Sequence, residues 1–170
     1  MNILDLGTGS GCIAITLADE FENSSVSAVD KSPQALSVAT QNAKRIGVSN
    51  IAFFEGSWYE PLVTTNADES NKFDIIVSNP PYIDPNDPHL AGLTDEPISA
   101  LIADNKGMAD ICHIVKTAPQ FLQPHGLLAI EHGYDQGEQV RGVFLSNGFG
   151  DVITVKDYGD NERVTLGVLN

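Results

Sequence analysis

The sequence alternates short apolar runs with segments of helical periodicity, and this alternation limits the folds that the chain can adopt. Apolar runs that predict strands lie at residues 3–6, 26–29, 51–54, 73–77 and 127–130. Segments with apolar residues three and four positions apart follow most of these runs and predict helices. Since parallel strands need a crossover between them and a helix commonly supplies it, the order predicts a doubly wound, mostly parallel sheet with helices on both faces.

The predicted helix after the second run carries a signal at each end. Ser32 is a preferred N-cap residue and Pro33 suits the first helical position, whereas Gly47 suits the C-terminal cap. Its buried face would consist of Leu36, Ala39, Ala43 and Ile46, and that of the first helix of Ala14, Leu17, Ala18 and Phe21. Two later helices are expected, one from Met108 until Pro119 kinks or ends it and one over 136–145.

The last two apolar runs have no helix between them. Residues 152–155 and 164–169 are joined by a polar turn at 158–161. A parallel pair would need a crossover of about a dozen residues or more, so we expect an antiparallel hairpin at one edge of the sheet. The sheet would then contain seven strands.

The first strand ends in the sequence Asp-Leu-Gly-Thr-Gly-Ser-Gly at residues 5–11. Glycine has no Cβ, so a ligand can approach this backbone closely, as pyrophosphates do at related turns with a different glycine spacing. Asp30 ends the second strand, where a carboxylate can accept both hydroxyls of a nucleoside ribose. The alternatives are a purely structural turn and a helix cap at Asp30, although Ser32 already fills that capping role.

The fourth strand leads into Asn79-Pro80-Pro81-Tyr82. The two prolines remove two backbone N–H donors, so nearby carbonyl groups stay free to accept, and Asn79 adds a carboxamide oxygen. An amide or amino NH₂ group lying here can donate one hydrogen to each acceptor, while Tyr82 offers an aromatic face. The alternative is a rigid start to the irregular stretch at about 83–105, and loops of that length are usually functional.

These residues carry a family resemblance. The tetrapeptide resembles the motif of the N6-adenine, N4-cytosine and N5-glutamine methyltransferases, and the predicted sheet resembles the Rossmann-like class I S-adenosylmethionine-dependent methyltransferase fold. From Asn2 to Gly167 the chain is most similar to the HemK-type release-factor N5-glutamine methyltransferases. The similar segments are residues 5–11, 29–30, 57–58, 76–83, 107–110, 131–133 and 157–167. The resemblance implies methyl transfer from S-adenosylmethionine to the glutamine of the Gly-Gly-Gln motif of peptide-chain release factors.

The resemblance also implies a set of site residues. The cofactor would be S-adenosylmethionine, which the reaction converts to S-adenosylhomocysteine. The residues that would bind it are Asp5, Gly7, Thr8, Gly9, Ser10, Gly11, Asp30, Trp58 and Asn79. Those that would hold the acceptor glutamine are Asn79, Pro80, Pro81 and Tyr82, with Asn79, Pro80 and Tyr82 as the catalytic residues. Without the resemblance, Trp58 reads equally well as a core aromatic. Glu131 and His132 end the fifth strand, near the carboxyl ends of the strands where these site residues lie, and we assign them no catalytic role.

Composition and charge limit the kinds of partner that the chain can bind. The chain has 170 residues and a net charge of −14, from 23 acidic and 9 basic residues, which disfavours direct binding to nucleic acid. No apolar run approaches the roughly 20 residues that span a bilayer. Cys12 and Cys112 lie in apolar helical patterns, so buried, reduced thiols are expected, and no metal-ligand spacing occurs. We expect a monomeric cytoplasmic enzyme whose partner is a release factor.

Residues 1–170 are expected to form the methyltransferase catalytic domain without the helical substrate-recognition domain that family members carry before the first strand. Residues 65–71 are read as a solvated loop insertion, and His89, His113 and His125 as surface or loop residues. Three other functions stay open. They are methylation of adenine in DNA, methylation of a glutamine in a ribosomal protein, and a non-catalytic cofactor-binding subunit. The first would need a basic recognition domain, and the last would have no need of the tetrapeptide.

Overall fold

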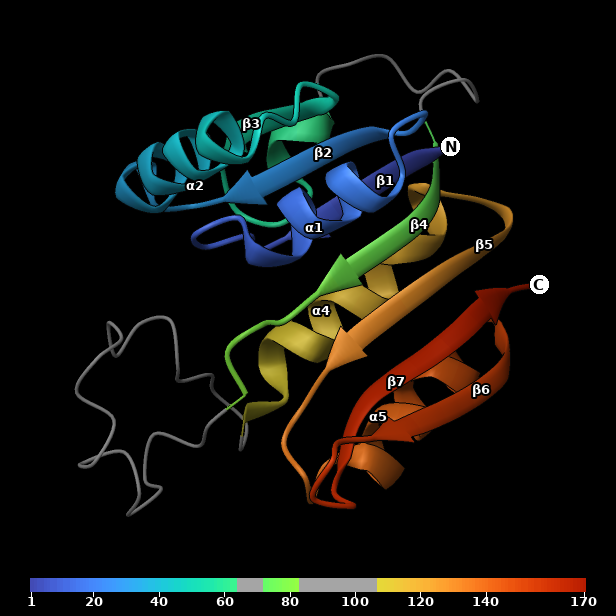
Figure 1. Ribbon diagram of the computed structural model, residues 1–170. Helices are drawn as coiled ribbons and strands as arrows, with labels where there is room; N and C mark the ends of the chain where they lie inside the picture. Colours follow the sequence, from blue (N-terminus) through green and yellow to red (C-terminus); the bar gives the residue numbers. More distant parts are fainter. Residues whose placement is uncertain (64–71, 83–106) are drawn as a thin grey trace.

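A computed structural model describes residues 1–63, 72–82 and 107–170, and these ranges contain one seven-stranded sheet (Figure 1). The strand order is β3-β2-β1-β4-β5-β7-β6. The strands are β1 (Asn2–Leu6), β2 (Ser25–Asp30), β3 (Ile51–Glu55), β4 (Phe73–Ser78), β5 (Leu122–Glu131), β6 (Phe149–Lys156) and β7 (Glu162–Leu169). All seven predicted strands are present.

The first five strands run in one direction, and among the described strands only β7 runs against them. β1 pairs in parallel with β2 and β4, β2 with β3, and β4 with β5. β7 is antiparallel to both β5 and β6, and it lies between them. The predicted doubly wound, mostly parallel sheet with a C-terminal antiparallel hairpin is therefore confirmed.

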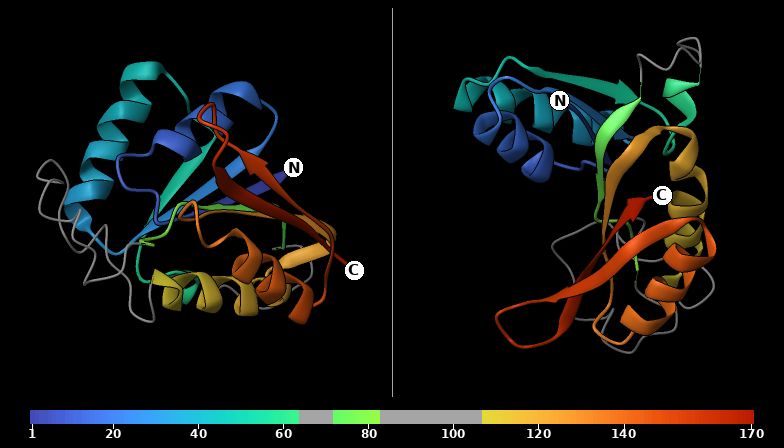
Figure 2. Two further views of the ribbon diagram at one scale, coloured as in Figure 1. Left: turned by 90° about the horizontal axis from the view of Figure 1, so that it is seen from below. Right: turned by 90° about the vertical axis from the view of Figure 1, so that its right-hand side faces the viewer.

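Helices cover the sheet on both faces. α1 (Cys12–Glu20) and α2 (Pro33–Ile46) pack on one face, and α4 (Ala109–Thr117) and α5 (Gly137–Ser146) pack on the other (Figures 1 and 2). Two short 3-10 helices, η1 (Glu60–Leu62) and η5 (Ala118–Gln120), complete the described elements. The helix expected to kink or end at Pro119 changes into η5 there, as the proline requires. None of the described helices is long and apolar enough to cross a membrane.

The apolar core has two parts, one on each side of the sheet. The larger part joins β4, β5, α4 and α5, and its fully buried members include Ile76, Ile111, Leu128 and Phe144. The smaller part lies beneath α1 and contains Ile3, Ala14, Ala18, Val26 and Ala28. β1 contributes to both parts, because its alternate side chains point to opposite faces. The strand that carries the glycine turn is thus the most completely enclosed.

The predicted end signals of α2 are confirmed. Ser32 is the N-cap, and its hydroxyl accepts a hydrogen bond from the Ala35 amide at 3.2 Å. Gly47 closes the helix in a left-handed conformation with φ 97°. The hairpin turn is likewise fixed locally, because the Asp157 carboxylate accepts from the amides of Gly159 and Asn161 at 2.8 and 3.0 Å.

Three predictions of burial are wrong. Phe21 is 44% exposed because it follows the last residue of α1 and leaves the helical direction there. Ile46 is 54% exposed at the end of α2, which packs over the edge strand β3, itself only partly buried. Cys12 is exposed at the start of α1, and Cys112 is half-buried. Apolar periodicity marks the face of a helix, but it does not show where the neighbouring surface ends.

β5 begins at Leu122, five residues before the predicted start. Pro124 and His125 argue against a strand in sequence, and His125 has a φ of 63°. The pairing with β4 accommodates them through a shift in register between Phe73 and Ile75. The proposed insertion at 65–71 and His89 lie outside the described residues, as does most of the irregular stretch, whereas His113 and His125 are exposed as expected.

The packing of α5 can be tested at adjacent positions. Phe144 is fully buried and its ring lies 5.1 Å from that of Phe149, centroid to centroid, whereas Leu145 is 63% exposed. Phe144→Ala should lower the free energy of unfolding by roughly 3–5 kcal/mol, because it removes buried surface and leaves a cavity. Leu145→Ala should change it by less than about 0.5 kcal/mol. Urea unfolding followed by circular dichroism measures both, and similar losses would contradict this account of the core.

Candidate active site

The glycine turn between β1 and α1 has a backbone that favours glycine at three alternate positions. Gly7, Gly9 and Gly11 have φ values of 74°, 55° and 84°, all in the left-handed region. A Cβ added to Gly11 would lie 2.7 Å from the Ile15 side chain, whereas one added to Gly9 would meet nothing within 4 Å. The turn is therefore closed toward the helix and open at Gly9.

A buried carboxylate holds this turn in shape. Asp5 is only 1% exposed, and its Oδ2 accepts hydrogen bonds from the Thr8 hydroxyl at 2.7 Å and from the Ala14 amide at 3.2 Å. The N-cap of α1 is Gly11, which has no side chain to cap the helix, so Asp5 satisfies a first-turn amide in its place. Asp5 and Thr8 thus shape the turn from within.

Burial raises the pKa of the Asp5 carboxyl to about 6 from its ordinary value of 3.8, although the hydrogen bonds from Thr8 and Ala14 lower it. The nearby negative charge of Asp30 adds a smaller increase. The other carboxylate oxygen, Oδ1, is buried and has no hydrogen-bond partner among the described residues.

Asp30 joins the end of β2 to the glycine turn. Its Oδ2 accepts from the Gly9 amide at 2.8 Å, and its Oδ1 accepts from the Ser32 amide at 2.8 Å. The carbonyl of Val29 accepts from the Thr8 amide at 3.0 Å beside it. The helix cap is Ser32, as predicted, and Asp30 is therefore not the cap. Asp30 lies half-buried against the glycine turn.

Trp58 lies against the same turn. A Cβ added to Gly7 would be 3.3 Å from Cζ3 of its indole, so the ring covers the first glycine. The side chain is partly buried against the larger core, and its φ is 48°. A left-handed conformation is unusual for so bulky a residue, and such outliers cluster at strained and functional sites. Trp58 is therefore both a core aromatic and a wall of the turn.

Asn79-Pro80-Pro81-Tyr82 begins directly after β4, the neighbour of β1. Ser78 pairs with Leu6 in the register of the two strands, and the Ser78 hydroxyl donates to the Leu6 carbonyl at 2.7 Å. Asn79 is exposed, Pro80 is buried, and Pro81 and Tyr82 are half-buried. Because β1 and β4 are parallel, the glycine turn and the tetrapeptide leave the sheet at the same edge.

Tyr82 bridges from the tetrapeptide to the end of β5. Its hydroxyl donates to Glu131 Oε1 at 3.3 Å, and its backbone carbonyl accepts from Gln136 Nε2 at 3.0 Å. Consecutive strands in the sheet, β2, β1, β4 and β5, therefore contribute Asp30, the glycine turn, Asn79 to Tyr82 and Glu131 to one rim. The chain order reverses between β1 and β4, which is where open α/β sheets bind their ligands.

His132 is fully buried behind this rim. Its Nδ1 lies 2.8 Å from the Gly133 carbonyl, and its Nε2 lies 2.9 Å from the Thr165 hydroxyl. Since a carbonyl can only accept, Nδ1 carries the proton and Nε2 accepts from Thr165. Burial lowers the pKa of this imidazole. His132 is therefore a neutral residue that ties the end of β5 to β7.

Sequence reasoning gave no site role to Gln136 or to Gly107, which both contact Tyr82. Gln136 stands at the N-cap of α5, where glutamine is not among the preferred residues, and this was the available signal. Ser10 is exposed, and its carbonyl accepts from Asn42 at 3.0 Å. No group of three or more His, Cys, Asp or Glu side chains that could hold a metal ion occurs in the part of the chain that the structure describes.

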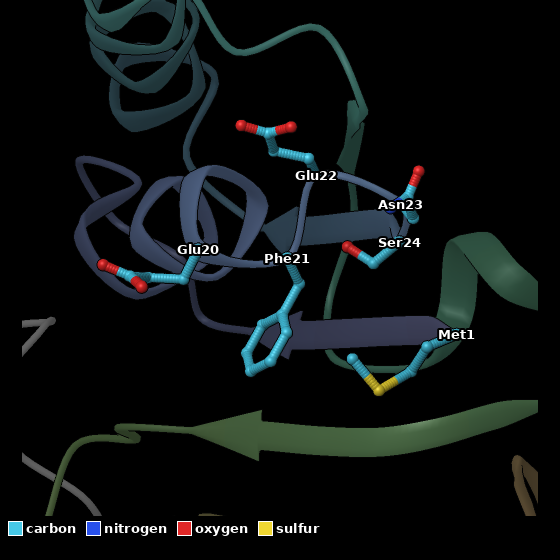
Figure 3. A pocket seen from close by; sticks show the side chains of 6 residues that line it. All are labelled: Met1, Glu20, Phe21, Glu22, Asn23 and Ser24. Carbon is cyan, nitrogen blue, oxygen red and sulfur yellow. The ribbon is translucent and has the colours of Figure 1, made fainter.

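A separate pocket lies away from this rim. It is lined by Met1, Phe21 and Ser24 with Glu20, Glu22 and Asn23, as Figure 3 shows. These residues belong to the start of β1 and the connection between α1 and β2, so the pocket is at the opposite ends of the strands. It shares no residue with the glycine turn or the tetrapeptide.

A glycine turn after β1, a carboxylate in the last residue of β2 and an antiparallel β7 are together typical of the class I S-adenosylmethionine-dependent methyltransferase fold. The family model described as Methyltransferase domain matches residues 1–152, and the chain belongs to this family.

Curated relatives narrow the comparison. The chain is 49% identical over 167 residues to the release factor glutamine methyltransferase of Salmonella typhimurium, covering 97% of this chain and 58% of the relative. The protein of that name from Vibrio cholerae is 48% identical, with 97% of this chain and 57% of the relative covered. The chain thus spans rather more than half the length of these relatives.

Solved structures support the fold. A ribosomal protein L11 methylase from Lactobacillus delbrueckii subsp. bulgaricus superposes with a TM-score of 0.69 at 20% identity, covering 99% of this chain and 70% of that one. A 16S rRNA methyltransferase from T. Thermophilus gives a TM-score of 0.70 at 20% identity, covering 99% of this chain and 37% of that one. At this level of identity the likeness shows a shared fold and no more.

The raised pKa of Asp5 predicts a pH dependence of stability. A carboxyl whose pKa rises on folding stabilises the folded state fully below its unfolded pKa near 3.8, and this contribution is lost as the pH rises to about 6. Asp5→Asn does not titrate and keeps one acceptor oxygen. Relative to the variant, the wild type should therefore lose roughly 2–3 kcal/mol of stability between about pH 4 and pH 6.5. Urea unfolding across this range tests it, and parallel pH curves for the two proteins would show that Asp5 ionises normally.

Proposed function

We propose that residues 1–170 form the catalytic domain of an S-adenosylmethionine-dependent enzyme that methylates the side-chain amide nitrogen, N5, of the glutamine in the Gly-Gly-Gln motif of release factors. The observation that carries the proposal is the position of Asn79-Pro80-Pro81-Tyr82 beside the glycine turn, on adjacent parallel strands. The names of the curated relatives support the substrate. These relatives are longer than this chain, so their names alone do not assign its substrate, and we infer the substrate from the names together with the site.

The residues present fit this cofactor. The turn at Gly7, Gly9 and Gly11 has open space at Gly9, and Asp30 and Trp58 lie against it. Each oxygen of Asp30 accepts one hydrogen bond from the protein and keeps a lone pair for a ribose hydroxyl. Oδ1 of Asp5, which has no hydrogen-bond partner among the described residues, is a further buried acceptor next to the turn. When bound, S-adenosylmethionine supplies a methyl group that is already activated on a sulfonium sulfur.

The tetrapeptide suits an amide acceptor. Pro80 and Pro81 have no backbone N–H, so the groups that the chain offers here are mostly acceptors. The exposed Asn79 carboxamide and the Pro80 carbonyl would each accept one hydrogen of the substrate NH₂ group, and the Tyr82 ring would lie along the planar amide. The amide nitrogen is a weak nucleophile because its lone pair is delocalised. Acceptors fixed beside it stabilise the positive charge that develops as it reacts, and the surplus proton leaves afterwards.

Charge favours a protein acceptor over a nucleic acid. The net charge of −14 repels phosphates, and the pair of adjacent basic residues, Lys44-Arg45, lies in the last turn of α2. A release factor is part of the translation machinery, so we place the enzyme in the cytoplasm, acting as a monomer on that protein.

The ribose role of Asp30 is tested by Asp30→Asn, which keeps one oxygen to hold Gly9 but removes the charge. Affinity for S-adenosylmethionine should fall by roughly 1.5–3 kcal/mol, the range for a hydrogen bond to a charged group. Glu55→Gln is the matched control, because Glu55 pairs with Asp30 in the β2–β3 register and is exposed. Calorimetric titration compares the three proteins. An unchanged affinity in Asp30→Asn would remove this residue from the ribose site.

The role of the tetrapeptide is tested by Asn79→Ala. Asn79 is exposed, so the variant should fold and bind S-adenosylmethionine within about threefold of the wild type, while kcat falls by roughly 100-fold or more, because the lost hydrogen bond matters most as charge develops. Asn23→Ala, at the far ends of the strands, is the control and should leave kcat unchanged. A kcat loss of only a few-fold in Asn79→Ala would contradict the orienting role.

The acceptor is identified with a labelled methyl donor and four candidate substrates: intact release factor, its Gly-Gly-Gln variant with alanine for glutamine, ribosomal protein and duplex DNA. We expect label on intact release factor alone, because binding of that protein around its Gly-Gly-Gln motif provides the remote binding energy that positions a small amide. Mass spectrometry of the tryptic peptide locates the methyl group. Label on DNA or only on ribosomal protein would replace the substrate and leave the family assignment in place.

A further inference from the structure

Tyr82 is held at both of its ends by residues that lie outside the tetrapeptide. Its hydroxyl donates to Glu131 Oε1 at 3.3 Å, and its backbone carbonyl accepts from Gln136 Nε2 at 3.0 Å. The two partners come from the end of β5 and from the start of α5. The aromatic ring is thus fixed relative to the sheet by contacts that do not depend on Asn79 or the prolines.

The Gln136 side chain connects two backbone groups. Its Oε1 accepts from the Gly133 amide at 2.8 Å, while its Nε2 donates to the Tyr82 carbonyl. Gln136 is the N-cap residue of α5 and is only 8% exposed, yet its side chain makes no capping bond to that helix. A buried carboxamide that leaves its own helix uncapped and joins two loops serves those loops rather than the helix.

Gly107 lies close to both the Tyr82 carbonyl and the Gln136 side chain. Its φ is 77°, and a Cβ at this position would overlap the carbonyl oxygen of Tyr82 and lie 2.8 Å from Gln136 Nε2. Only glycine allows the two chain segments to approach so closely. The Tyr82 carbonyl is thus packed closely against the Gly107 backbone and bound by the Gln136 amide.

The base of this arrangement is anchored in the sheet. Gly133 accepts at its carbonyl from His132 Nδ1 at 2.8 Å and from the Gln136 amide at 3.0 Å. His132 Nε2 accepts from Thr165, whose hydroxyl lies 2.9 Å from that of Thr154. Hydrogen bonds therefore run from the β6–β7 hairpin to Tyr82 through buried groups, and such networks are rigid when every member is satisfied.

We propose that Gln136 is a positioning residue that fixes the backbone carbonyl of Tyr82, and with it the ring that lies along the acceptor amide. The inference rests on the proposed function, because that function gives the ring its task. It goes beyond that function by adding a residue 54 positions away in the chain. Gln136 does not touch the reacting atoms; it acts through Tyr82.

Two substitutions separate the two hydrogen bonds of Gln136. Gln136→Met keeps the length of the side chain and loses both bonds, whereas Gln136→Glu keeps the acceptor for Gly133 and loses the donor to Tyr82. Both should lower kcat by roughly 10- to 100-fold, since a displacement of about 1 Å has this effect on a positioned reactant. Affinity for S-adenosylmethionine should stay within about twofold of the wild type. Gln139→Met, an exposed position on the same helix, is the control and should leave both values unchanged.

A spectroscopic measurement tests the position of Tyr82 without any substrate. The chain has four tyrosines, so fluorotyrosine labelling gives few ¹⁹F resonances, and Tyr82→Phe identifies that of Tyr82. In Gln136→Met and Gln136→Glu this resonance should shift or broaden, while the resonance of the buried Tyr59 should not move.

An unchanged Tyr82 resonance in both variants would overturn the proposal, as would wild-type kcat in Gln136→Glu, because that variant lacks the donor to Tyr82. Equal losses in cofactor affinity and in kcat would also overturn it and leave Gln136 a general structural residue. If the wild type failed to methylate release factor, the proposed function would fall, but the ¹⁹F result would still decide whether Gln136 positions Tyr82.

Discussion

The buried carboxylate of Asp5 is the group on which the organisation of the rim depends. It binds the Thr8 hydroxyl and the Ala14 amide at once, so it fixes the glycine turn to the end of β1 and also satisfies the first turn of α1. Burying a carboxylate is costly, and its raised pKa is the measure of that cost. The turn that these hydrogen bonds fix is open at Gly9, where an added Cβ would meet nothing within 4 Å.

The sheet brings the remaining groups to this turn. Asp30, Asn79 and Glu131 lie far apart in sequence, but β2, β1, β4 and β5 are adjacent and parallel, so their carboxyl ends meet at one edge. The tetrapeptide therefore belongs to a larger hydrogen-bonded group of residues. Tyr82 is held by Glu131 and Gln136, and Gln136 is connected through Gly133 to His132 and its contact with β7.

Signals between residues close in the sequence predicted much of the fold. The order of strands and helices, the cap at Ser32 and the turn closed by Gly47 follow from short-range chemistry and are present as expected. Contacts between distant segments were not predictable. Nothing near Gln136 in the sequence indicates that its side chain reaches Tyr82, and the periodicity around Phe21 does not show that α1 ends one residue before it. The roles of Asp30, Trp58 and Asn79 toward a ligand remain predictions, although the structure places the first two against the glycine turn and Asn79 on the neighbouring strand.

The position of β7 has a consequence for how the chain folds during synthesis. β7 follows β6 in the sequence, yet it lies between β5 and β6 in the sheet, so β6 has no place in the sheet until β7 has been made. Until then β5 has an open edge, and His132 lacks its Thr165 partner. A nascent chain can assemble the glycine turn early, but the support behind Tyr82 is completed only by the final strand. The glycine turn and the support behind Tyr82 would therefore form at different times during synthesis.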